Sequence, residues 1–329
     1  MTHSAPRIIF HGENAASFSD GFAALLGQEA RISLLPNRLE QPADRAAYAA
    51  ADAIIGVRFD ASLPRPDRLR LFHVPGAGTD SVDFGALPPQ AVVCNCFGHE
   101  TAIAEYVMAA LLMRCVPLAD ADRRLRAGDW AYWAGAPERV HGELAGLTLG
   151  LLGFGHIAKA VAQRARAFGL TIHVANRSAV DAPGLVDRAF PLADLAAFWG
   201  SADAFVVTVP LAADTAGIVG AAAFAAMRRH AVLINVARGP VVDEAALFAS
   251  LRDRRIGGAV IDTWYRYPTA DAPNCPPANL PFQDLPGLLM TPHMSGWTAG
   301  TIRRRQQVMA ANVVHRLRGE PCVNVVRGV

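Results

Sequence analysis

Three small residues, Gly153, Gly155 and Ala158, stand in the spacing G-x-G-x-x-A and are the first feature of this sequence that predicts chemistry. The first glycine of such a turn permits a tight reversal, the second lets a pyrophosphate approach the backbone, and the small third residue lets helix and strand pack closely. The following helix offers free N–H groups and the positive end of its dipole to the phosphates. The pattern predicts a dinucleotide site with a turn made of Gly153, Phe154, Gly155, His156 and Ile157.

The residues on either side of this turn predict the elements that must hold it. Residues 147–152 form an apolar run that is too short for a buried helix and has the length of a central parallel strand. Apolar residues then recur at helical spacing as far as Gly169, and residues 171–175 form a second β-rich run. A bare G-x-G-x-x-A also occurs in plain loops, but its place between a strand and a helix favours the dinucleotide site.

The end of the second β-rich run predicts which dinucleotide binds. An acidic residue is expected there to accept hydrogen bonds from the adenosine ribose, but the chain reads Asn176-Arg177-Ser178. No carboxylate repels a 2′-phosphate, and an arginine and a hydroxyl are placed to bind one. We therefore expect NADP(H) in preference to NAD(H). The alternative stays open, because a solvated Arg177 that stacks on adenine would suit either cofactor.

Further along the chain, short apolar runs alternate with helical stretches, and polar residues follow the runs. Strands are expected over residues 204–209, 231–235, 258–261 and 288–290, with helices over 221–227 and 244–252. In one parallel sheet, the carboxyl ends of these strands lie at the edge that faces the cofactor. The residues expected along this edge are Val209, Pro210, Thr215, Val236, Ala237, Arg238, Asp262, His293, Ser295 and Gly296.

The N-terminal part of the chain predicts a second, smaller sheet. Strands are expected over residues 7–10, 53–57 and 71–74, a helix over residues 18–27, and a long, nearly uncharged helix over residues 101–116. The third strand runs into the loop Gly76-Ala77-Gly78, outside the carboxyl end of a strand, where ligands bind in such sheets. Its N–H groups would form a nest for a carboxylate, and the alternative is a simple tight turn.

The composition limits the class and location of the protein. At 329 residues, with 52% apolar and 18% charged side chains, the chain is long and apolar enough for two folded α/β domains. A net charge of +2 with scattered arginines gives no electrostatic case for nucleic acid. We expect a cytoplasmic protein outside the membrane, because a signal-peptide pattern and long apolar stretches are lacking. Five cysteines without a C-x-x-C pair predict neither disulfides nor a metal site.

Several longer motifs resemble the family of D-isomer-specific 2-hydroxyacid dehydrogenases. They are GAGTDSVD at 76–83, AIAEYVMAALL at 102–112, GELAGLTLGLLGFGHIAKAVAQRARAFG at 142–169, VPLAADTAGIV at 209–219, INVARGPVVDEAAL at 234–247 and TPHMSG at 291–296. The resemblance implies an α/β fold with two Rossmann-like domains. A discontinuous, flavodoxin-like substrate domain would comprise residues 1–98 plus 298–329. An inserted, doubly wound NAD(P)-binding domain with a dimerisation segment would comprise residues 99–297.

The same resemblance implies interconversion of a small 2-oxo acid and the D-2-hydroxy acid, of the glyoxylate or hydroxypyruvate type, by hydride transfer to or from C4 of the nicotinamide. Arg238 would bind the substrate carboxylate and polarise the carbonyl, and His293 would be the acid/base. Hydride addition builds an alkoxide, which needs a cation and a proton donor, and histidine suits proton transfer near neutral pH. The substrate would also meet Gly76, Ala77 and Gly78, and Trp133 of the partner subunit in a homodimer.

One position departs from the family pattern. The family usually has a glutamate shortly after the strand that ends at Asp262, where it hydrogen-bonds the catalytic histidine, and Tyr267 takes that place here. A phenol can orient His293 by hydrogen bonding, but it brings no negative charge at its ordinary pKa. Tyr267 is therefore the third residue that we expect to take part in catalysis.

This departure leaves three other members of the superfamily open as alternatives. Formate dehydrogenases also lack the glutamate, but His99 stands where they have an asparagine. Phosphite dehydrogenases have a lysine where this chain has Ala77. NAD(H)-sensing corepressors keep the same fold and are interaction proteins. A reductase of 2-oxo acids fits the motifs best.

Overall fold

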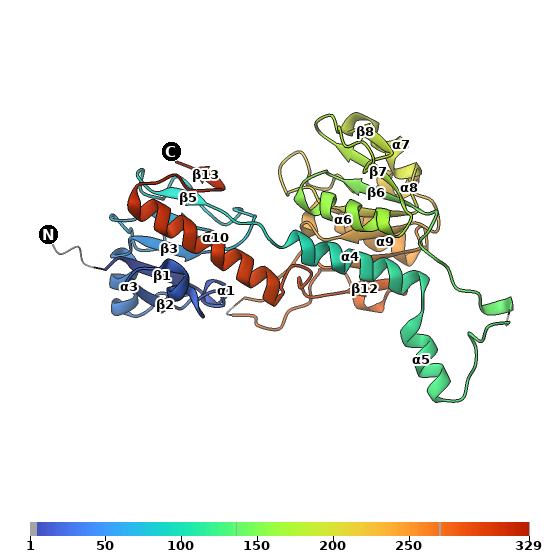
Figure 1. Cartoon of the computed structure of the whole chain (residues 1–329). Helices are drawn as coiled ribbons and strands as arrows, with labels where there is room; N and C mark the ends of the chain where they lie inside the picture. The colour runs from blue at the N-terminus through green and yellow to red at the C-terminus, as the bar shows by residue number, and fades with distance from the viewer. Residues whose placement is uncertain (1–4, 136, 270, 329) are drawn as a thin grey trace. The chain divides into compact units, whose positions relative to one another are not determined.

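The computed structural model describes residues 5–135, 137–269 and 271–328 and divides the chain into two compact units (Figure 1). One unit comprises Met1–Gly98 and Thr298–Val329, and the other comprises His99–Trp297. The first unit is thus built from both ends of the sequence, with the second inserted between them. Each unit has one mostly parallel sheet with helices, so the predicted α/β class with two Rossmann-like sheets is confirmed.

The discontinuous unit contains a sheet with the strand order β13-β5-β4-β3-β1-β2. Its strands are β1 (Arg7–His11), β2 (Arg31–Leu35), β3 (Ala53–Gly56), β4 (Leu71–His73), β5 (Val92–Cys94) and β13 (Val325–Arg327). Strands β1 to β5 pair in parallel, in the order 2-1-3-4-5 of flavodoxin-like sheets, and β13 pairs with β5 in the antiparallel sense. Its helices are α1 (Glu13–Ala16), α2 (Phe22–Leu26), α3 (Pro42–Ala49) and α10 (Ala299–Arg318).

The helix expected over residues 18–27 is confirmed only over Phe22–Leu26, which form α2. The short helix α1 precedes the expected range, and a turn separates the two helices. Gly21, directly before α2, has a φ of 70°, a left-handed conformation that interrupts a helix and that glycine adopts without strain. Phe18 and Phe22 are nevertheless fully buried, and Phe22 packs edge-to-face on Phe10 with the ring centroids 5.0 Å apart. The apolar spacing therefore predicted the buried side chains but not the break.

The inserted unit contains a sheet in which all pairs are parallel, in the order β12-β11-β10-β9-β6-β7-β8. Its strands are β6 (Thr148–Leu152), β7 (Thr171–Asn176), β8 (Arg188–Pro191), β9 (Ala204–Val207), β10 (Val232–Asn235), β11 (Gly258–Ile261) and β12 (Leu288–Met290). Its helices are α4 (Glu100–Cys115), α5 (Leu118–Arg126), α6 (His156–Ala167), α7 (Leu195–Gly200), α8 (Ala221–Ala226) and α9 (Glu244–Arg252). Counted from β6, the order contains the doubly wound 3-2-1-4-5-6. The order reverses between β6 and β9, which is where dinucleotides bind in such sheets.

Apolar side chains form a core on each face of this sheet. Strands β9, β10 and β11 are buried along their whole length, as is typical of parallel strands that are covered on both faces. On one face the rings of Phe198, Trp199 and Phe205 pack with centroids between 4.8 and 5.3 Å apart. A Cβ at Gly150 of β6 would lie 2.5 Å from Cδ1 of Phe205, so the packing leaves no room for a side chain there. On the other face α4 packs against α6.

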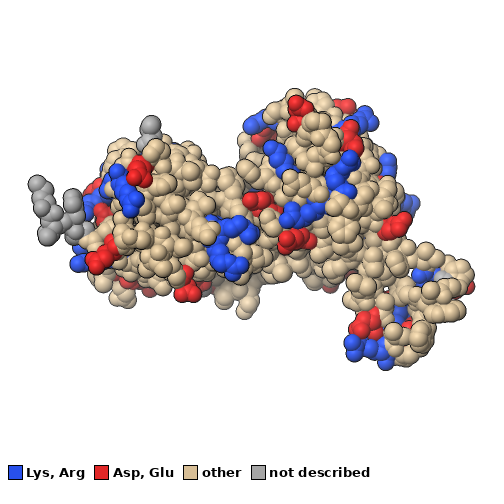
Figure 2. All heavy atoms as spheres, in the orientation of Figure 1, with Lys and Arg blue, Asp and Glu red and all other residues tan. Residues whose placement is uncertain are grey.

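The surface carries charges of both signs. Figure 2 shows scattered patches of lysine and arginine and of aspartate and glutamate on a face that is made mostly of other residues. Among the described residues, no single helix is long and apolar enough to cross a membrane. The pair α4 and α5, bent by 51°, passes that test on length and composition together. In α4, however, Ala104 and Val107 are fully buried in the core of the inserted unit.

Candidate active site

The glycine turn joins β6 to α6, as the sequence predicts. Gly153 has a φ of 89°, and its N–H donates a hydrogen bond to the carbonyl oxygen of Ala175 at 2.8 Å. A Cβ on Gly153 would lie 2.9 Å from Cγ1 of Val209, whereas a Cβ on Gly155 would meet no atom within 4 Å. Gly155 is the N-cap of α6 and has no side chain to cap the helix. The turn thus leaves space and backbone donors where a pyrophosphate is expected.

The segment that follows β7 presents polar groups at the same edge of the sheet as the glycine turn. Asn176 ends β7, and its Nδ2 donates to the carbonyl oxygen of Ser178 at 3.1 Å. Arg177 and Ser178 are exposed, and Arg177 forms no ion pair within the described part of the chain. In the turn itself, His156 is exposed and Phe154 and Ile157 are half-buried.

The loop after β9 is closed from within by Thr215. Its hydroxyl donates to the carbonyl oxygen of Pro210 at 2.6 Å and accepts the N–H of Ala212 at 2.8 Å. Thr215 is buried, whereas Pro210 is exposed and Val209 lies beside the glycine turn. Of the three residues that the sequence predicts here, Thr215 shapes the loop, and Val209 and Pro210 form its surface.

Arg238 follows β10 on a short loop that Asn235 shapes. The buried Asn235 accepts the N–H of Ala237 on Oδ1 at 3.1 Å and donates from Nδ2 to the carbonyl oxygen of Arg238 at 3.0 Å. Val236 and Ala237 are buried, and Arg238 is half-buried, with Nη1 donating to the carbonyl oxygen of Ala237 at 2.8 Å. These bonds hold the arginine at the carboxyl end of its strand.

Gly239 brings this loop against the segment that follows β11. A methyl group on Gly239 would collide with the carbonyl oxygen of Trp264, so the two backbones touch. Trp264 is itself buried, and its Nε1 donates to the carbonyl oxygen of Thr291 at 2.8 Å. The close approach therefore links the loops after β10, β11 and β12, which carry Arg238, Asp262 and His293.

Asp262 lies directly after β11, and its side chain is completely buried. Its Oδ1 accepts hydrogen bonds from the hydroxyl of Thr291 at 2.6 Å and the N–H of Met294 at 2.9 Å. Its Oδ2 accepts the N–H of Ser295 at 3.0 Å. The carboxylate thus holds the chain on both sides of His293.

His293 lies in a tight turn with a φ of 58°, a left-handed conformation that only a few per cent of residues other than glycine adopt. Its N–H donates to the carbonyl oxygen of Thr291 at 3.0 Å. On the far side of the turn, a Cβ on Gly296 would lie 3.2 Å from Cβ of His99, so Gly296 lets the turn pack closely on the start of α4.

The hydroxyl of Tyr267 lies 2.9 Å from Nδ1 of His293 and 3.1 Å from the backbone nitrogen of Trp264. Because the N–H of Trp264 can only donate, the phenol proton is free to donate to Nδ1. The phenol donates to Nδ1 when the neutral imidazole carries its proton on Nε2, and its oxygen accepts from Nδ1–H in the other tautomer. The structure thus brings two of the three predicted catalytic side chains into direct contact.

The surroundings of this pair shift both pKa values. The outer edge of His293 is exposed, but burial on its other sides lowers the pKa of the imidazole; Asp262 opposes this shift and Arg238 adds to it. Burial also raises the pKa of Tyr267. Near neutral pH the pair is therefore an imidazole beside an uncharged phenol, with a guanidinium close by. Such a group can exchange one proton and stabilise a negative oxygen.

In the discontinuous unit, the loop Gly76-Ala77-Gly78 follows β4. It is fixed through its carbonyl oxygens, since Asn95 Nδ2 donates to that of Ala77 at 2.7 Å and the N–H of Cys96 donates to that of Gly76 at 3.0 Å. Within the described residues, the N–H groups of the three loop residues have no acceptor. This arrangement fits the expected nest for an anion.

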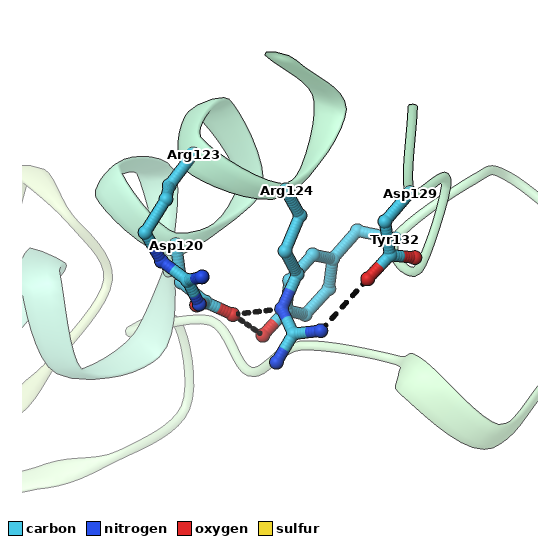
Figure 3. Close-up of polar contacts among 5 residues, drawn as sticks. All are labelled: Asp120, Arg123, Arg124, Asp129 and Tyr132. Carbon is cyan, nitrogen blue, oxygen red and sulfur yellow. Dashed lines mark hydrogen bonds and ion pairs between the residues drawn. The ribbon is translucent and has the colours of Figure 1, made fainter. Parts of the chain in front are cut away.

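Trp133 lies on an arm, defined here as residues 118–135, which extends from the rest of the inserted unit (Figure 1). Helix α5 contains no buried residue, and Trp130 and Trp133 are 66% and 61% exposed. Polar contacts hold the loop after α5, which contains Asp129 and Tyr132, against that helix (Figure 3). Asp120 accepts hydrogen bonds from Tyr132 at 3.0 Å, from Nε of Arg124 at 2.6 Å and from Arg123, and Arg124 also pairs with Asp129 at 2.8 Å.

Sequence reasoning missed three residues that shape the site: Asn235, Trp264 and Tyr106, whose hydroxyl lies 2.7 Å from that of Thr291. Asn235 offered a signal, because it is a polar residue at the end of an apolar strand and precedes Arg238 by three positions. Trp264 and Tyr106 offered none, since aromatic residues in apolar segments are usually core residues. No group of histidine, cysteine, aspartate or glutamate that could hold a metal occurs among the described residues.

Comparison with known proteins gives the family. Residues 108–295 match the family model described as D-isomer specific 2-hydroxyacid dehydrogenase, NAD binding domain. The chain is 34% identical over 284 residues to (S)-sulfolactate dehydrogenase of Chromohalobacter salexigens, covering 82% of this chain and 87% of that protein. It is 30% identical over 304 residues to glyoxylate/hydroxypyruvate reductase B of Citrobacter koseri, covering 89% and 90%.

A solved structure agrees with these relatives. The 2-hydroxyacid dehydrogenase of Ketogulonicigenium vulgare Y25 is similar to this chain with a TM-score of 0.81 and 25% identity, covering 98% of this chain and 99% of that one. The match to the family model, the related proteins and the doubly wound sheet with its glycine turn all indicate the same family. The protein belongs to the family of D-isomer-specific 2-hydroxyacid dehydrogenases, oxidoreductases with a domain for a nicotinamide cofactor.

Proposed function

We propose that this protein interconverts a small 2-oxo acid and the corresponding D-2-hydroxy acid, with His293 as the acid/base and Arg238 as the residue that binds the substrate carboxylate. The observation that supports this most directly is the 2.9 Å contact between Tyr267 and Nδ1 of His293, at the same sheet edge as Arg238. The names of the relatives, a sulfolactate dehydrogenase and a glyoxylate/hydroxypyruvate reductase, support a small hydroxy acid as substrate.

The residues around the glycine turn fit a nicotinamide dinucleotide, which would supply or accept the hydride at C4 of its ring. Gly155 leaves an open cradle at the uncapped start of α6, and Gly153 permits the tight turn beneath it. The exposed Arg177 and Ser178 would hold a 2′-phosphate, and the loop containing Val209 and Pro210 would border the cofactor. We therefore propose NADP(H) as the preferred cofactor.

In reduction, Arg238 would orient the substrate through its carboxylate and stabilise the negative charge that develops on the carbonyl oxygen. His293 would donate the proton from Nε2. A neutral imidazole that gave up this proton would become an imidazolate, so reduction should proceed from the imidazolium. In that state Nδ1–H donates to Tyr267, whose oxygen has two lone pairs and can accept both this bond and the one from Trp264. Tyr267 thus orients His293 in both protonation states.

We further propose that the substrate carboxylate meets the N–H groups of Gly76, Ala77 and Gly78, and that the arm belongs to a homodimer. Exposed aromatic residues are enriched at protein interfaces, and the arm presents Trp130 and Trp133 without a core of its own. Trp133 would then close the substrate pocket of the partner subunit.

The experiment that tests the proposed reaction is oxidation of NADPH and of NADH, followed by absorbance, with a panel of 2-oxo acids that includes glyoxylate and hydroxypyruvate. We expect turnover with at least one 2-oxo acid, and a higher kcat/KM with NADPH. The reverse direction is run with formate and phosphite as controls, which should give no turnover. Cofactor binding without turnover on any of these compounds would refute the enzymatic proposal and favour a nucleotide-sensing protein.

A further inference from the structure

We infer that Thr291, held by Tyr106 and Asp262, is a positioning residue that sets the orientation of the His293 ring. This inference rests on the proposed role of His293 as the acid/base. It concerns residues of the inserted unit alone, which come from α4 and from the segments after β11 and β12.

Thr291 uses each of its polar groups in the structure. Its hydroxyl donates to Oδ1 of Asp262 at 2.6 Å, because the carboxylate can only accept. This bond uses the only hydroxyl proton of Thr291. The 2.7 Å contact between the hydroxyls of Thr291 and Tyr106 must therefore be a hydrogen bond that Tyr106 donates. The Thr291 carbonyl oxygen accepts Nε1–H of Trp264 at 2.8 Å, and its N–H donates to the carbonyl oxygen of Ile261 at 3.0 Å. The residue two positions before His293 is thereby fixed from three directions.

The turn needs such support because of its conformation. The φ of 58° at His293 is unfavourable for a residue with a Cβ and persists only where the surroundings hold it. Asp262 accepts the Thr291 hydroxyl before His293 and the N–H groups of Met294 and Ser295 after it. A loss of the Thr291 bond would leave the carboxylate attached to one side of the turn only.

Tyr106 extends the support to α4. Its side chain is half-buried, and burial raises the pKa of the phenol, so the hydroxyl remains a donor at neutral pH. Arg238 and Asp262 act on His293 by charge, and Tyr267 contacts its ring, whereas Thr291 has no charge. Variants at Thr291 and Tyr106 therefore change the geometry of the site and leave its charges in place.

The variants that test this inference are Thr291→Val, which has nearly the same shape without the hydroxyl, Thr291→Ser, which keeps the hydroxyl, and Tyr106→Phe. We expect Thr291→Val to lower kcat about tenfold or more, since a shift of the acid/base by a fraction of an ångström is costly. KM for NADPH should stay within about twofold, because Thr291 is not among the residues expected to contact the cofactor. Thr291→Ser should restore most of kcat, and Tyr106→Phe should lower kcat by a smaller factor of about threefold.

A matched control is Tyr265→Phe, which removes another half-buried phenol from the same unit, one that donates to the carbonyl oxygen of Val242 at 3.0 Å. Each protein is also assayed with NADPH deuterated at C4. In Thr291→Val the deuterium effect on kcat should rise, because the chemical step becomes slower than the others.

The inference fails if folded Thr291→Val keeps the kcat and isotope effect of the parent, or if Tyr265→Phe loses as much activity as Tyr106→Phe. If Thr291→Val does not fold, Tyr106→Phe and Thr291→Ser decide alone. Near-normal turnover of His293→Ala would instead overturn the proposed function. An inactive His293→Ala beside a fully active Thr291→Val would overturn only the role of Thr291.

Discussion

Replacement of Tyr267 by glutamate should move the pH dependence of the reaction. In the proposed mechanism, reduction requires protonated His293, so kcat/KM should be highest below the pKa of the imidazole and should fall as the pH rises through it. Burial already lowers the pKa of His293. The phenol of Tyr267, 2.9 Å from Nδ1, is uncharged and therefore does not raise this pKa as a carboxylate would. In Tyr267→Glu, a carboxylate beside Nδ1 favours the imidazolium, and the alkaline limb should shift to higher pH.

The size of the shift follows from distance and solvent exposure. Glutamate is shorter than tyrosine, so its carboxylate would lie at about 4–5 Å from Nδ1, inside the range in which an opposite charge shifts a pKa. Two unit charges 4 Å apart interact by about 1 kcal/mol in water and about 4 kcal/mol at an effective dielectric constant of 20. Tyr267 is 44% exposed, so the interaction energy should lie near the lower of these two values. We therefore expect the pKa of His293, and with it the alkaline limb, to rise by about one unit.

The assay is a pH profile of kcat/KM for NADPH-dependent reduction of the best 2-oxo acid. The matched control is Tyr267→Gln, which has the shape of the glutamate and lacks its charge. Its alkaline limb should stay near that of the parent protein, while kcat reports any loss of ring orientation. If Tyr267→Glu is folded and its alkaline limb coincides with that of Tyr267→Gln, a negative charge at position 267 does not change the pKa of His293. That result would refute the prediction.

Three further changes test other parts of the site and the fold. Arg177→Ala should weaken NADPH binding by about 1.5–3 kcal/mol and leave NADH nearly unchanged, and equal losses by titration for both cofactors would contradict a 2′-phosphate contact. His293→Ala should lower kcat by roughly 10²–10⁴-fold, whereas Arg238→Ala should damage both KM and kcat; steady-state kinetics that leave either variant near normal would refute its role. Gly150→Ala places a Cβ 2.5 Å from Cδ1 of Phe205 and should lower stability by about 1–3 kcal/mol in urea unfolding, with a cofactor preference that does not change.

The sequence predicted most reliably those features that are local in the chain. The turn at Gly153 and Gly155 needs only a strand before it and a helix after it, and both are visible within about thirty residues. The strands that end before Arg238 and Asp262 are apolar runs, as buried parallel strands are. The α/β class, and much of the edge where the site lies, therefore followed from short-range patterns.

Secondary-structure elements with few buried apolar residues could not be predicted from the sequence. Strand β2 (Arg31–Leu35) begins with an arginine and lies at the edge of its sheet, so its burial is incomplete and its pattern weak. Helix α5 (Leu118–Arg126) has no buried residue, and its arginines and aspartates pair with each other within the arm. A hydrophobic periodicity arises where one face of an element packs against a core. Neither β2 nor α5 has enough contact with a core to show a clear period.

The residues that hold the turn of His293 could not be predicted from the sequence for a different reason. Asp262 was expected at the cofactor edge because it follows a strand, and the structure places its carboxylate inside the unit, where three donors from residues 29–33 positions later occupy it. Tyr106 is 185 residues from its partner Thr291. No spacing rule connects such positions, because their proximity is a product of the strand order β12-β11-β10 and of α4 packing beside it. A short motif therefore predicts the chemistry of His293, whereas the orientation of its ring depends on tertiary contacts that only the folded sheet creates.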